Sequence, residues 1–294
     1  MMLDRLRSGE ILVGDGAWGT MLMAKGLDPG ESPESINLTR PEVLTEIAAL
    51  YVDAGADLIT TNTFGGSPLR LAAHGLERQT ETINRQAVEA LKPVVAGCAV
   101  ISASVGPTGR ILTPYGDTDP AVLSDAFVRQ IGPLVDAGAD VICIETMIDL
   151  REAELALEAV RSVSGDIPII ATMTFDVTPR GIFTAMGVTV KQAAHGLACA
   201  GADVVGSNCG NGIDRMVEIA REFAVHSELP FIIQSNAGLP EHRDRELVYP
   251  ESPAFMARRV DTLVDLGVAI IGGCCGTGPD HIRAIRAAVD RRRS

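Results

Sequence analysis

Two adjacent cysteines, Cys274 and Cys275, are the residues of this sequence best suited to chemistry. They lie in the glycine-rich segment GGCCGTGP at positions 272–279, directly after the apolar run at 268–271. Neighbouring side chains of an extended segment point to opposite sides, so one apolar core cannot bury both. Thiolates are ligands that zinc favours, and a catalytic zinc site typically has three protein ligands and one open position. A third thiolate is therefore expected, and Cys209, which also follows an apolar run, is the candidate.

Other interpretations of the cysteines must be weighed beside this one. A single cysteine at a strand end is usually a small buried hydrophobe. A vicinal pair could form a redox disulfide, although clustered cysteines in a reducing compartment more often bind metal or take part in catalysis. Cys98, Cys143 and Cys199 lie among alanines and valines, and we expect them in or near the core.

The composition indicates a large aliphatic core and an acidic surface. The chain has 294 residues, of which 46% are hydrophobic and only 4% aromatic. Cores of this kind are typical of buried parallel sheets. The formal net charge of −13 argues against nucleic acid and anionic membranes as partners, because both are bound by basic surfaces.

The N-terminal segment MMLDRLR carries charges where a signal peptide has a long apolar stretch, and no apolar run in the sequence reaches the length of a membrane span. We therefore expect a cytoplasmic protein. Six cysteines in a chain of this length are too few for a disulfide scaffold, so they should be available as thiolates.

A short repeat indicates how the chain is organised. DAGADLI at 53–59, DAGADVI at 136–142 and CAGADVV at 199–205 each place a glycine between a helical pattern and an apolar run, and 265–271 is a looser copy. A glycine at this position is typical of a helix C-terminus that leads into a strand. Repeated joints of this kind predict a wound parallel sheet.

Apolar runs and helical periodicity together predict eight strand–helix pairs, and this number and chain length match a (β/α)8 TIM barrel formed by a single domain, residues 1–294. An open doubly wound sheet is the alternative, but no G-x-G-x-x-G motif follows the first strand. The predicted strands are 11–14, 58–62, 100–104, 141–145, 169–174, 204–208, 231–235 and 269–273; the predicted helices are 41–54, 80–91, 120–137, 150–164, 189–200, 214–225, 253–266 and 279–291.

A barrel carries its active site at the C-terminal face of the strands, and this rule brings the cysteines together. Cys209 follows the sixth predicted strand, and the vicinal pair, 65 residues later, follows the eighth. Asp15 and Glu145 follow the first and fourth strands and could meet a substrate ammonium, while backbone N–H groups of residues 16–20 could hold a carboxylate. Alternatively, Asp15 is a turn or capping residue and Glu145 belongs to an ion pair.

Zinc bound by three thiolates is a poor Lewis acid, but it keeps a fourth sulfur deprotonated at neutral pH. This ligand set therefore favours alkyl transfer to a substrate thiol. None of the five histidines lies in a motif with metal-ligand spacing, which argues against a water-activating hydrolase.

Seven motifs, taken in order along almost the whole chain, resemble the zinc-dependent homocysteine S-methyltransferase family. Within the family the sequence is most similar to the homocysteine-binding module of cobalamin-dependent methionine synthase, because of NAG at 236–238 and VYP at 248–250. The aromatic-rich loop of betaine-homocysteine methyltransferase is replaced here by NTFG at 62–65. The motifs are DGAWGT at 15–20, TNTF at 61–64, GPTG at 106–109, ET at 145–146, GSNC at 206–209, NAG at 236–238 and GGCCGT at 272–277.

The resemblance implies one Zn2+ bound by Cys209, Cys274 and Cys275, with the homocysteine sulfur as fourth ligand and no further catalytic residue. It implies that Asn236 fills the fourth position when substrate is absent. It also implies that Asp15 and Glu145 contact the amino group, within a substrate-binding set that includes Gly16, Ala17, Gly19 and Thr20.

The methyl donor is not given by the resemblance. The sequence lacks the folate, cobalamin and reactivation modules of methionine synthase and has no Asp-x-His-x-x-Gly corrinoid-ligand motif, since His281 directly follows Asp280. An external donor is expected, and a methylated corrinoid protein carrying methylcobalamin is favoured as partner. S-methylmethionine or betaine is the alternative donor. A thiol other than homocysteine as acceptor, and a non-catalytic zinc or redox sensor, also remain open.

Two polar segments lack a core pattern. The stretch from Pro240 to Pro253 and the stretch from Gly26 to Pro41 are long for loops after strands. We interpret each as a surface excursion beside the site that acts either as a lid or as inert decoration.

Overall fold

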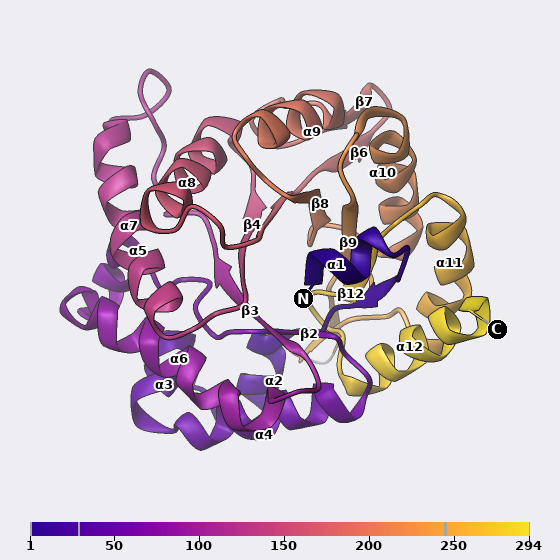
Figure 1. Cartoon of the computed structure of the whole chain (residues 1–294), viewed down its shortest axis with the longest axis horizontal. Helices are drawn as coiled ribbons and strands as arrows, with labels where there is room; N and C mark the ends of the chain where they lie inside the picture. The colour runs from indigo at the N-terminus through magenta and orange to yellow at the C-terminus, as the bar shows by residue number, and fades with distance from the viewer. Residues whose placement is uncertain (1, 29, 244–245, 294) are drawn as a thin grey trace.

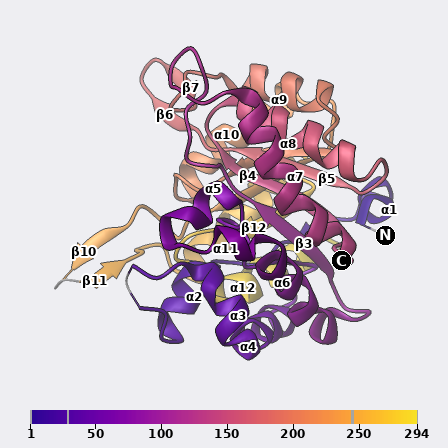
Figure 2. The ribbon, with the colours of Figure 1, turned by 90° about the vertical axis from the view of Figure 1, so that its left-hand side faces the viewer.

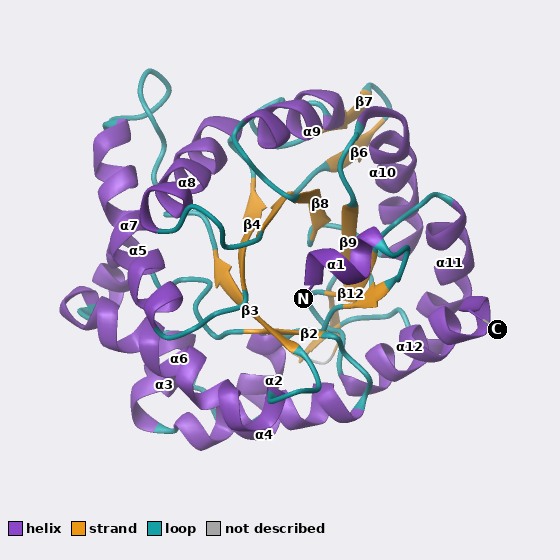
Figure 3. Ribbon diagram, viewed as in Figure 1, coloured by secondary structure: helices purple, strands orange, loops and turns teal. Residues whose placement is uncertain are grey.

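The computed structural model describes residues 2–28, 30–243 and 246–293, and it contains the predicted barrel. Eight parallel strands form one sheet, and an isolated bridge between Gly14 and Leu58 joins its first and last members, so the sheet closes into a ring (Figure 3). In chain order these strands are β1 (Leu12–Val13), β2 (Leu58–Thr60), β3 (Val100–Val105), β4 (Val141–Met147), β5 (Ile169–Met173), β8 (Val204–Asn208), β9 (Phe231–Ser235) and β12 (Ile270–Gly273).

Eight helices surround the ring, and each lies between two consecutive barrel strands or after the last one (Figure 1). All eight overlap the helices that the sequence predicts. They are α4 (Pro41–Asp53), α6 (Thr80–Val95), α7 (Pro120–Asp136), α8 (Leu150–Val163), α9 (Val190–Cys199), α10 (Ile213–His226), α11 (Pro253–Asp265) and α12 (Pro279–Arg293).

Smaller elements, which the sequence patterns did not predict, decorate the barrel. Two antiparallel hairpins follow β5 and β9, and the second of them projects from the body of the molecule (Figure 2). These elements are the helices α1 (Met2–Arg7), α2 (Trp18–Ala24), α3 (Ile36–Thr39) and α5 (Pro68–Leu71), the 3-10 helices at Pro33–Ser35, Ala72–His74 and Glu77–Gln79, and the hairpins β6 (Asp176–Thr178) with β7 (Gly181–Phe183) and β10 (Glu241–Arg243) with β11 (Glu246–Val248).

The strands bury both faces, as successive side chains point alternately inward and outward. Val13, Ile59 and Ile101 pack outward against the helices, in the larger apolar cluster. Leu12 and Leu58 point into the barrel, where Met2 of α1 joins them. Helix α1 therefore covers the N-terminal end of the barrel, as Figure 1 shows at its centre, and leaves the opposite end for the site.

The repeated DAGAD segments have a common structural role. Their glycines at 55, 138 and 201 have positive φ, which a helix C-terminus of this type requires. The aspartates that follow, Asp57, Asp140 and Asp203, each accept a hydrogen bond of 2.8 Å from a backbone N–H of the preceding barrel strand. Each repeat therefore ends a helix and ties the next strand to its neighbour.

No helix in the described ranges combines the length and the apolar character that a bilayer crossing requires.

Candidate metal and substrate site

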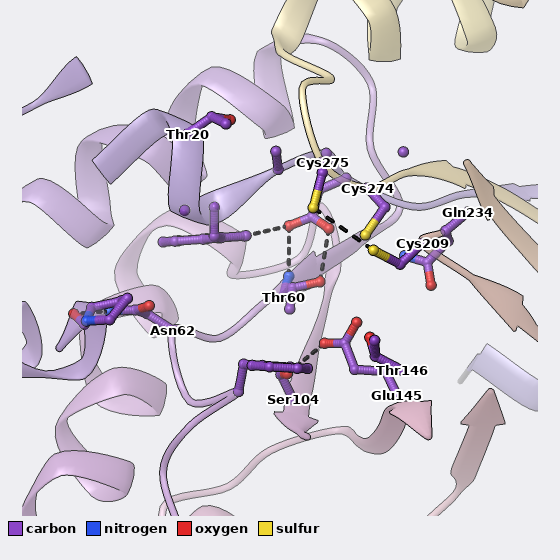
Figure 4. A pocket seen from close by; sticks show the side chains of 18 of the residues that line it. Thr20, Thr60, Asn62, Ser104, Glu145, Thr146, Cys209, Gln234, Cys274 and Cys275 are labelled. Atoms are coloured by element: carbon purple, nitrogen blue, oxygen red, sulfur yellow. Dashed lines mark hydrogen bonds between the residues drawn. The ribbon is translucent and has the colours of Figure 1, made fainter. Parts of the chain in front are cut away.

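The three cysteines and both predicted carboxylates line one cavity of about 420 Å³ at the C-terminal end of the barrel. Figure 4 shows the sulfurs of Cys209, Cys274 and Cys275 pointing toward one another, with Glu145 on the facing wall. The sequence prediction that these residues meet at one face of the barrel is confirmed.

The spacing of the sulfurs suits a tetrahedral metal ion. The three Sγ atoms lie within 4.8 Å of one another, and those of Cys209 and Cys275 are 3.8 Å apart. Zn–S bonds of about 2.3 Å at tetrahedral angles place two sulfurs about 3.8 Å apart. The sulfurs are therefore placed for one zinc ion without rearrangement of the loops.

Backbone hydrogen bonds between neighbouring strand ends hold the cysteine loops. The N–H of Cys209 donates to the carbonyl of Gln234 over 3.0 Å, and that of Cys274 donates to the carbonyl of Ser235 over 2.7 Å. Cys209 itself has a φ of +62°, an uncommon conformation for a residue other than glycine. The ends of β8, β9 and β12 thus form one rigid support for the three thiols.

Tyr249 covers the cysteine loop from outside. Its ring lies against Gly276, where an added Cβ would be 2.1 Å from the ring, and Gly276 has a φ of +78°. Cys209 raises the pKa of the Cys275 thiol to about 11, and the neighbouring Tyr249 hydroxyl opposes this shift. The position therefore requires glycine at 276 and brings a phenol to the thiol cluster.

The thiols cannot all ionise together without a cation. Hydrogen bonds from the Cys274 and Cys275 thiols lower the pKa of Cys209, because they stabilise its thiolate. The same contacts raise the pKa of Cys274 and of Cys275. A divalent cation among the three sulfurs would remove this conflict, because it favours the deprotonated form of every ligand.

Asn236 provides an independent test of the metal fit. Its side chain is 5% exposed, and its amide lies close enough to Cys209 to favour the thiolate, although the Cys274 and Cys275 thiols lower the pKa of Cys209 more. Its Oδ1 atom is buried and has no hydrogen-bond partner among the described residues. Buried acceptors are rarely left unpaired, so an oxygen of this kind beside three sulfurs fits a cation site.

Asp15 lies at the end of β1 and is almost fully buried. Its carboxylate accepts hydrogen bonds from the indole N–H of Trp18 at 2.8 Å and from the backbone N–H and hydroxyl of Thr60, both at 2.7 Å. Burial raises the pKa of Asp15 to about 6, although these three bonds oppose the shift. Three of its roughly four acceptor sites are thus already occupied by the protein.

Glu145 lies at a register shift of β4, beside Thr146, which has a φ of +62°. Its carboxylate accepts from the hydroxyl of Ser104 and, at 3.1 Å, from the side-chain amide of Asn208. Burial raises the pKa of Glu145 to about 7. About half of its acceptor capacity remains for a ligand.

The glycine-rich turn after β1 is fitted against the cysteine loop. At Gly16 an added Cβ would lie 2.8 Å from the carbonyl and hydroxyl oxygens of Thr277, so no larger residue fits. The N–H of Ala17 donates to the Thr277 carbonyl over 3.0 Å and is therefore not free for a ligand. Gly19 and Thr20, in the first turn of α2, line the cavity.

Sequence reasoning gave no role to several residues of the site. Trp18, Asn208 and Tyr249 stand inside quoted motifs, so a signal was present. Glu34 comes from the stretch between Gly26 and Pro41, where no periodicity singles it out. In the structure it is buried, and its carboxylate accepts from the Gly65 N–H at 2.6 Å.

The remaining cysteines lie away from this cluster. Cys143 is buried inside the barrel, as expected. Cys98 and Cys199 are exposed, so their expected place in or near the core is wrong. Both occur near helix C-termini, where the chain lies at the surface, and their alanine neighbours did not reveal this.

The two polar stretches differ in the structure. The stretch from Gly26 to Pro41 forms part of the cavity wall through Pro33 and Glu34. The stretch from Pro240 to Pro253 contains the projecting hairpin β10–β11, and its residues 244 and 245 lie outside the described part. Their movement as lids stays a prediction.

The chain is similar to known proteins along nearly its whole length. A family model described as homocysteine S-methyltransferase matches residues 12–289. The chain is 32% identical to a methionine synthase of Mycobacterium tuberculosis and 31% identical to one of Mycobacterium leprae, over 98% and 96% of its length. It spans only about a quarter of the length of these two relatives.

Solved structures agree on the fold. The oxidised and metallated forms of the homocysteine methyltransferase MmuM from Escherichia coli each superpose with a TM-score of 0.81, at 23% identity. Each match covers 98% of this chain and 99% of the other. With the family model covering nearly the whole barrel, the chain belongs to the homocysteine S-methyltransferase family.

Proposed function

We propose that this chain transfers a methyl group to the thiol of homocysteine and forms methionine, with one zinc ion held by Cys209, Cys274 and Cys275. The observation that carries the proposal is the convergence of three sulfurs on the wall of an acidic cavity. Structural zinc is normally closed by four protein ligands, whereas here three thiols converge and the neighbouring Asn236 supplies only a replaceable amide oxygen.

When bound, the zinc would keep the incoming thiol deprotonated and therefore nucleophilic at neutral pH. The chain's own residues orient the substrate. Glu145 has free acceptor capacity and faces the cysteines, so we propose it as the main contact of the homocysteine ammonium. Asp15, whose oxygens are already bonded to Trp18 and Thr60, contributes mainly negative charge.

The substrate carboxylate would lie at the start of α2. The first N–H groups of a helix have no partner within it, and Gly19 and Thr20 belong to the first turn of α2 and line the cavity. The backbone N–H groups there would offset the negative charge of the substrate carboxylate.

A small sulfonium or quaternary ammonium compound is the donor that the cavity favours. Trp18, Phe64 and Tyr249 bring aromatic rings to a cavity that also contains carboxylates and thiols. Aromatic rings attract cations of this kind. In the transfer, the homocysteine sulfur forms a bond to the methyl carbon while the bond from that carbon to the donor heteroatom breaks. The electron pair of the broken bond neutralises the positive charge of the donor.

A methylated corrinoid protein is the second candidate donor, and it rests on a different observation. The relatives found by sequence are named methionine synthase and are more similar to this chain than MmuM is. In the resemblance described above, that enzyme class takes its methyl group from methylcobalamin.

One assay distinguishes these donors. Zinc-loaded protein would be incubated with homocysteine and, in parallel, S-methylmethionine, betaine, methylcobalamin and methyl-folate, and methionine would be measured. We expect the highest rate with S-methylmethionine; transfer from methylcobalamin alone would establish the second candidate. Cys275→Ala serves as the matched control and should bind less zinc and give no methionine.

The sensor alternative is tested on the same samples. An enzyme should bind one zinc per chain and release about one proton as homocysteine binds. If homocysteine left the zinc coordination unchanged and no donor gave methionine, the methyltransferase proposal would be wrong.

A further inference from the structure

A second cavity of about 370 Å³ opens beside the first one at the rim of the barrel. The two share Pro33, Glu34 and Phe64 as lining residues, so they adjoin along these side chains. The Phe64 ring lies against Gly106, where an added Cβ would be 2.6 Å from two ring carbons. Phe64 therefore stands where the two cavities meet.

The second cavity is basic, although the protein as a whole is acidic. Arg70, His74 and Arg110 line it. Within the described ranges, none of these three side chains forms a hydrogen bond or a salt bridge, whereas Arg5 and Arg129 each pair with a carboxylate. Two guanidinium groups thus face one cavity without a salt bridge from the described part of the protein; burial raises the pKa of the nearby Glu152, and the charge of Arg70 opposes that rise.

The carboxylate in this wall is already engaged. Glu34 accepts from the Ser32 hydroxyl and from the Gly65 N–H, both over 2.6 Å. It therefore lies at the boundary with the first cavity, held by protein donors, and does not pair with Arg70 or Arg110.

The loop that carries Arg110 is held in place by a buried residue. Glu152 of α8 accepts from the Thr108 N–H over 2.8 Å and from the Thr108 hydroxyl over 2.6 Å. Gly109 follows with a φ of +76°, and an added Cβ there would be 3.0 Å from the Arg70 guanidinium. This explains the GPTG motif: it shapes a fixed loop over which Arg70 can lie.

We propose that this cavity, formed by Arg70, His74 and Arg110, binds a carboxylate or phosphate group of the methyl donor while the methyl end of the donor lies in the first cavity. Guanidinium groups bind both anions through paired hydrogen bonds. The assignment rests on the proposed methyl transfer, but the binding of an anion can be tested without it.

The first test measures binding alone. Inorganic phosphate and, separately, glutarate would be titrated into zinc-loaded protein while backbone NMR signals are followed. We expect saturable shifts at residues 70, 74 and 110, lost in Arg70→Gln/Arg110→Gln and retained in the control Arg221→Gln, an exposed arginine on α10. Equal shifts in the double variant, or shifts elsewhere only, would overturn the anion site.

The second test asks whether the anion belongs to the donor. With a donor that supports transfer, the double variant should raise the KM of the donor at least tenfold and leave the KM of homocysteine unchanged. Amidation of the donor carboxylate should raise the KM of the donor for the wild-type protein to the same extent, and it should change the KM for the double variant little. An unchanged donor KM would show that the cavity binds a separate anion and would refute the donor assignment.

The two tests also separate this inference from the proposed function. If no donor gives methionine, methyl transfer fails, while the NMR titration still decides whether the cavity binds anions.

Discussion

Asn208 connects the metal-side and substrate-side halves of the site. Its fully buried amide donates to Glu145 and to the Thr146 hydroxyl, and its oxygen accepts from the Thr146 N–H and the Thr172 hydroxyl. All of its hydrogen-bonding capacity is used. Because Cys209 follows it directly in the chain, the positions of Glu145 and of the thiol cluster are coupled.

Asn208→Asp tests this coupling. The substitution replaces the donor that faces Glu145 by an oxygen, and two adjacent carboxyl groups cannot both ionise easily. We expect homocysteine affinity, measured by calorimetry, to fall at least tenfold while metal analysis still finds one zinc per chain. Wild-type affinity in this variant would contradict the positioning role.

The pKa of Glu145 predicts how homocysteine binding depends on pH. With a pKa raised to about 7, Glu145 is mostly protonated at pH 5.5 and must lose its proton to pair with an ammonium. The substrate thiol also loses one proton on binding to zinc. Between pH 5.5 and 6.5 the association constant should therefore rise by about two powers of ten.

Glu145→Gln separates the two protons. Its affinity should be lower, and its rise in affinity over the same pH range should be about one power of ten smaller than in the wild type, because the Glu145 proton no longer takes part. Calorimetry at several pH values with excess zinc measures both slopes. Equal slopes would place the ammonium elsewhere.

At the scale of residues, the sequence predicted what chemistry itself requires. Three thiols after apolar runs and two acids at strand ends could be found because few residue types can bind zinc or carry a negative charge. Glu34 and Asn208 could not be assigned, because their roles depend on partners 31 and 63 residues away, Gly65 and Glu145.

The repeated aspartates show how elements stabilise one another. Asp57 accepts from the Val13 N–H and also forms ion pairs with Arg5 and Arg286. Asp140 accepts from the Ile101 N–H but forms no ion pair with any residue that the structure describes. A carboxylate that accepts a backbone N–H stabilises by about 1.5–3 kcal/mol. Removal of a largely buried charge from its partners costs about 3–5 kcal/mol.

Substitutions at the two aspartates should therefore differ in cost. We expect Asp140→Asn to lower the free energy of unfolding by about 1–2 kcal/mol and Asp57→Asn by about 3 kcal/mol or more. Urea denaturation followed by circular dichroism measures both. Equal losses would mean that the arginine pairs at Asp57 contribute nothing.

The barrel elements were predictable because they repeat. All eight strands and eight outer helices overlap their predicted ranges, because hydrophobic periodicity and the residues that end helices recur in each strand–helix unit. Helix α1 was read only as a charged N-terminus, because its apolar residues become a core only when the barrel end is in place. The hairpin after β5 lacks a buried face that would mark it.

For the molecule as a whole, the metal site and the core lie apart. The cysteines stand on loops at one end, whereas the apolar clusters fill the barrel and the layer between strands and helices. Zinc removal by a chelator should leave the circular dichroism spectrum unchanged. It should lower the Tm only as far as the loss of the stabilisation from zinc binding requires. Cys209→Ala, which should not bind zinc, should match chelated wild type; loss of helical signal in either would show that the metal is structural.

The short first strand makes the barrel wall uneven. β1 shares two residue pairs with β12 and a single bridge with β2, whereas β4 shares four with each neighbour. The wall is thus less tightly paired where Asp15 and its turn emerge than beneath Glu145. A substrate bound between these two sides would contact a well-paired strand at Glu145 and a more mobile one at Asp15. Amide hydrogen exchange should therefore be faster in β1 and the turn that follows it than in β4.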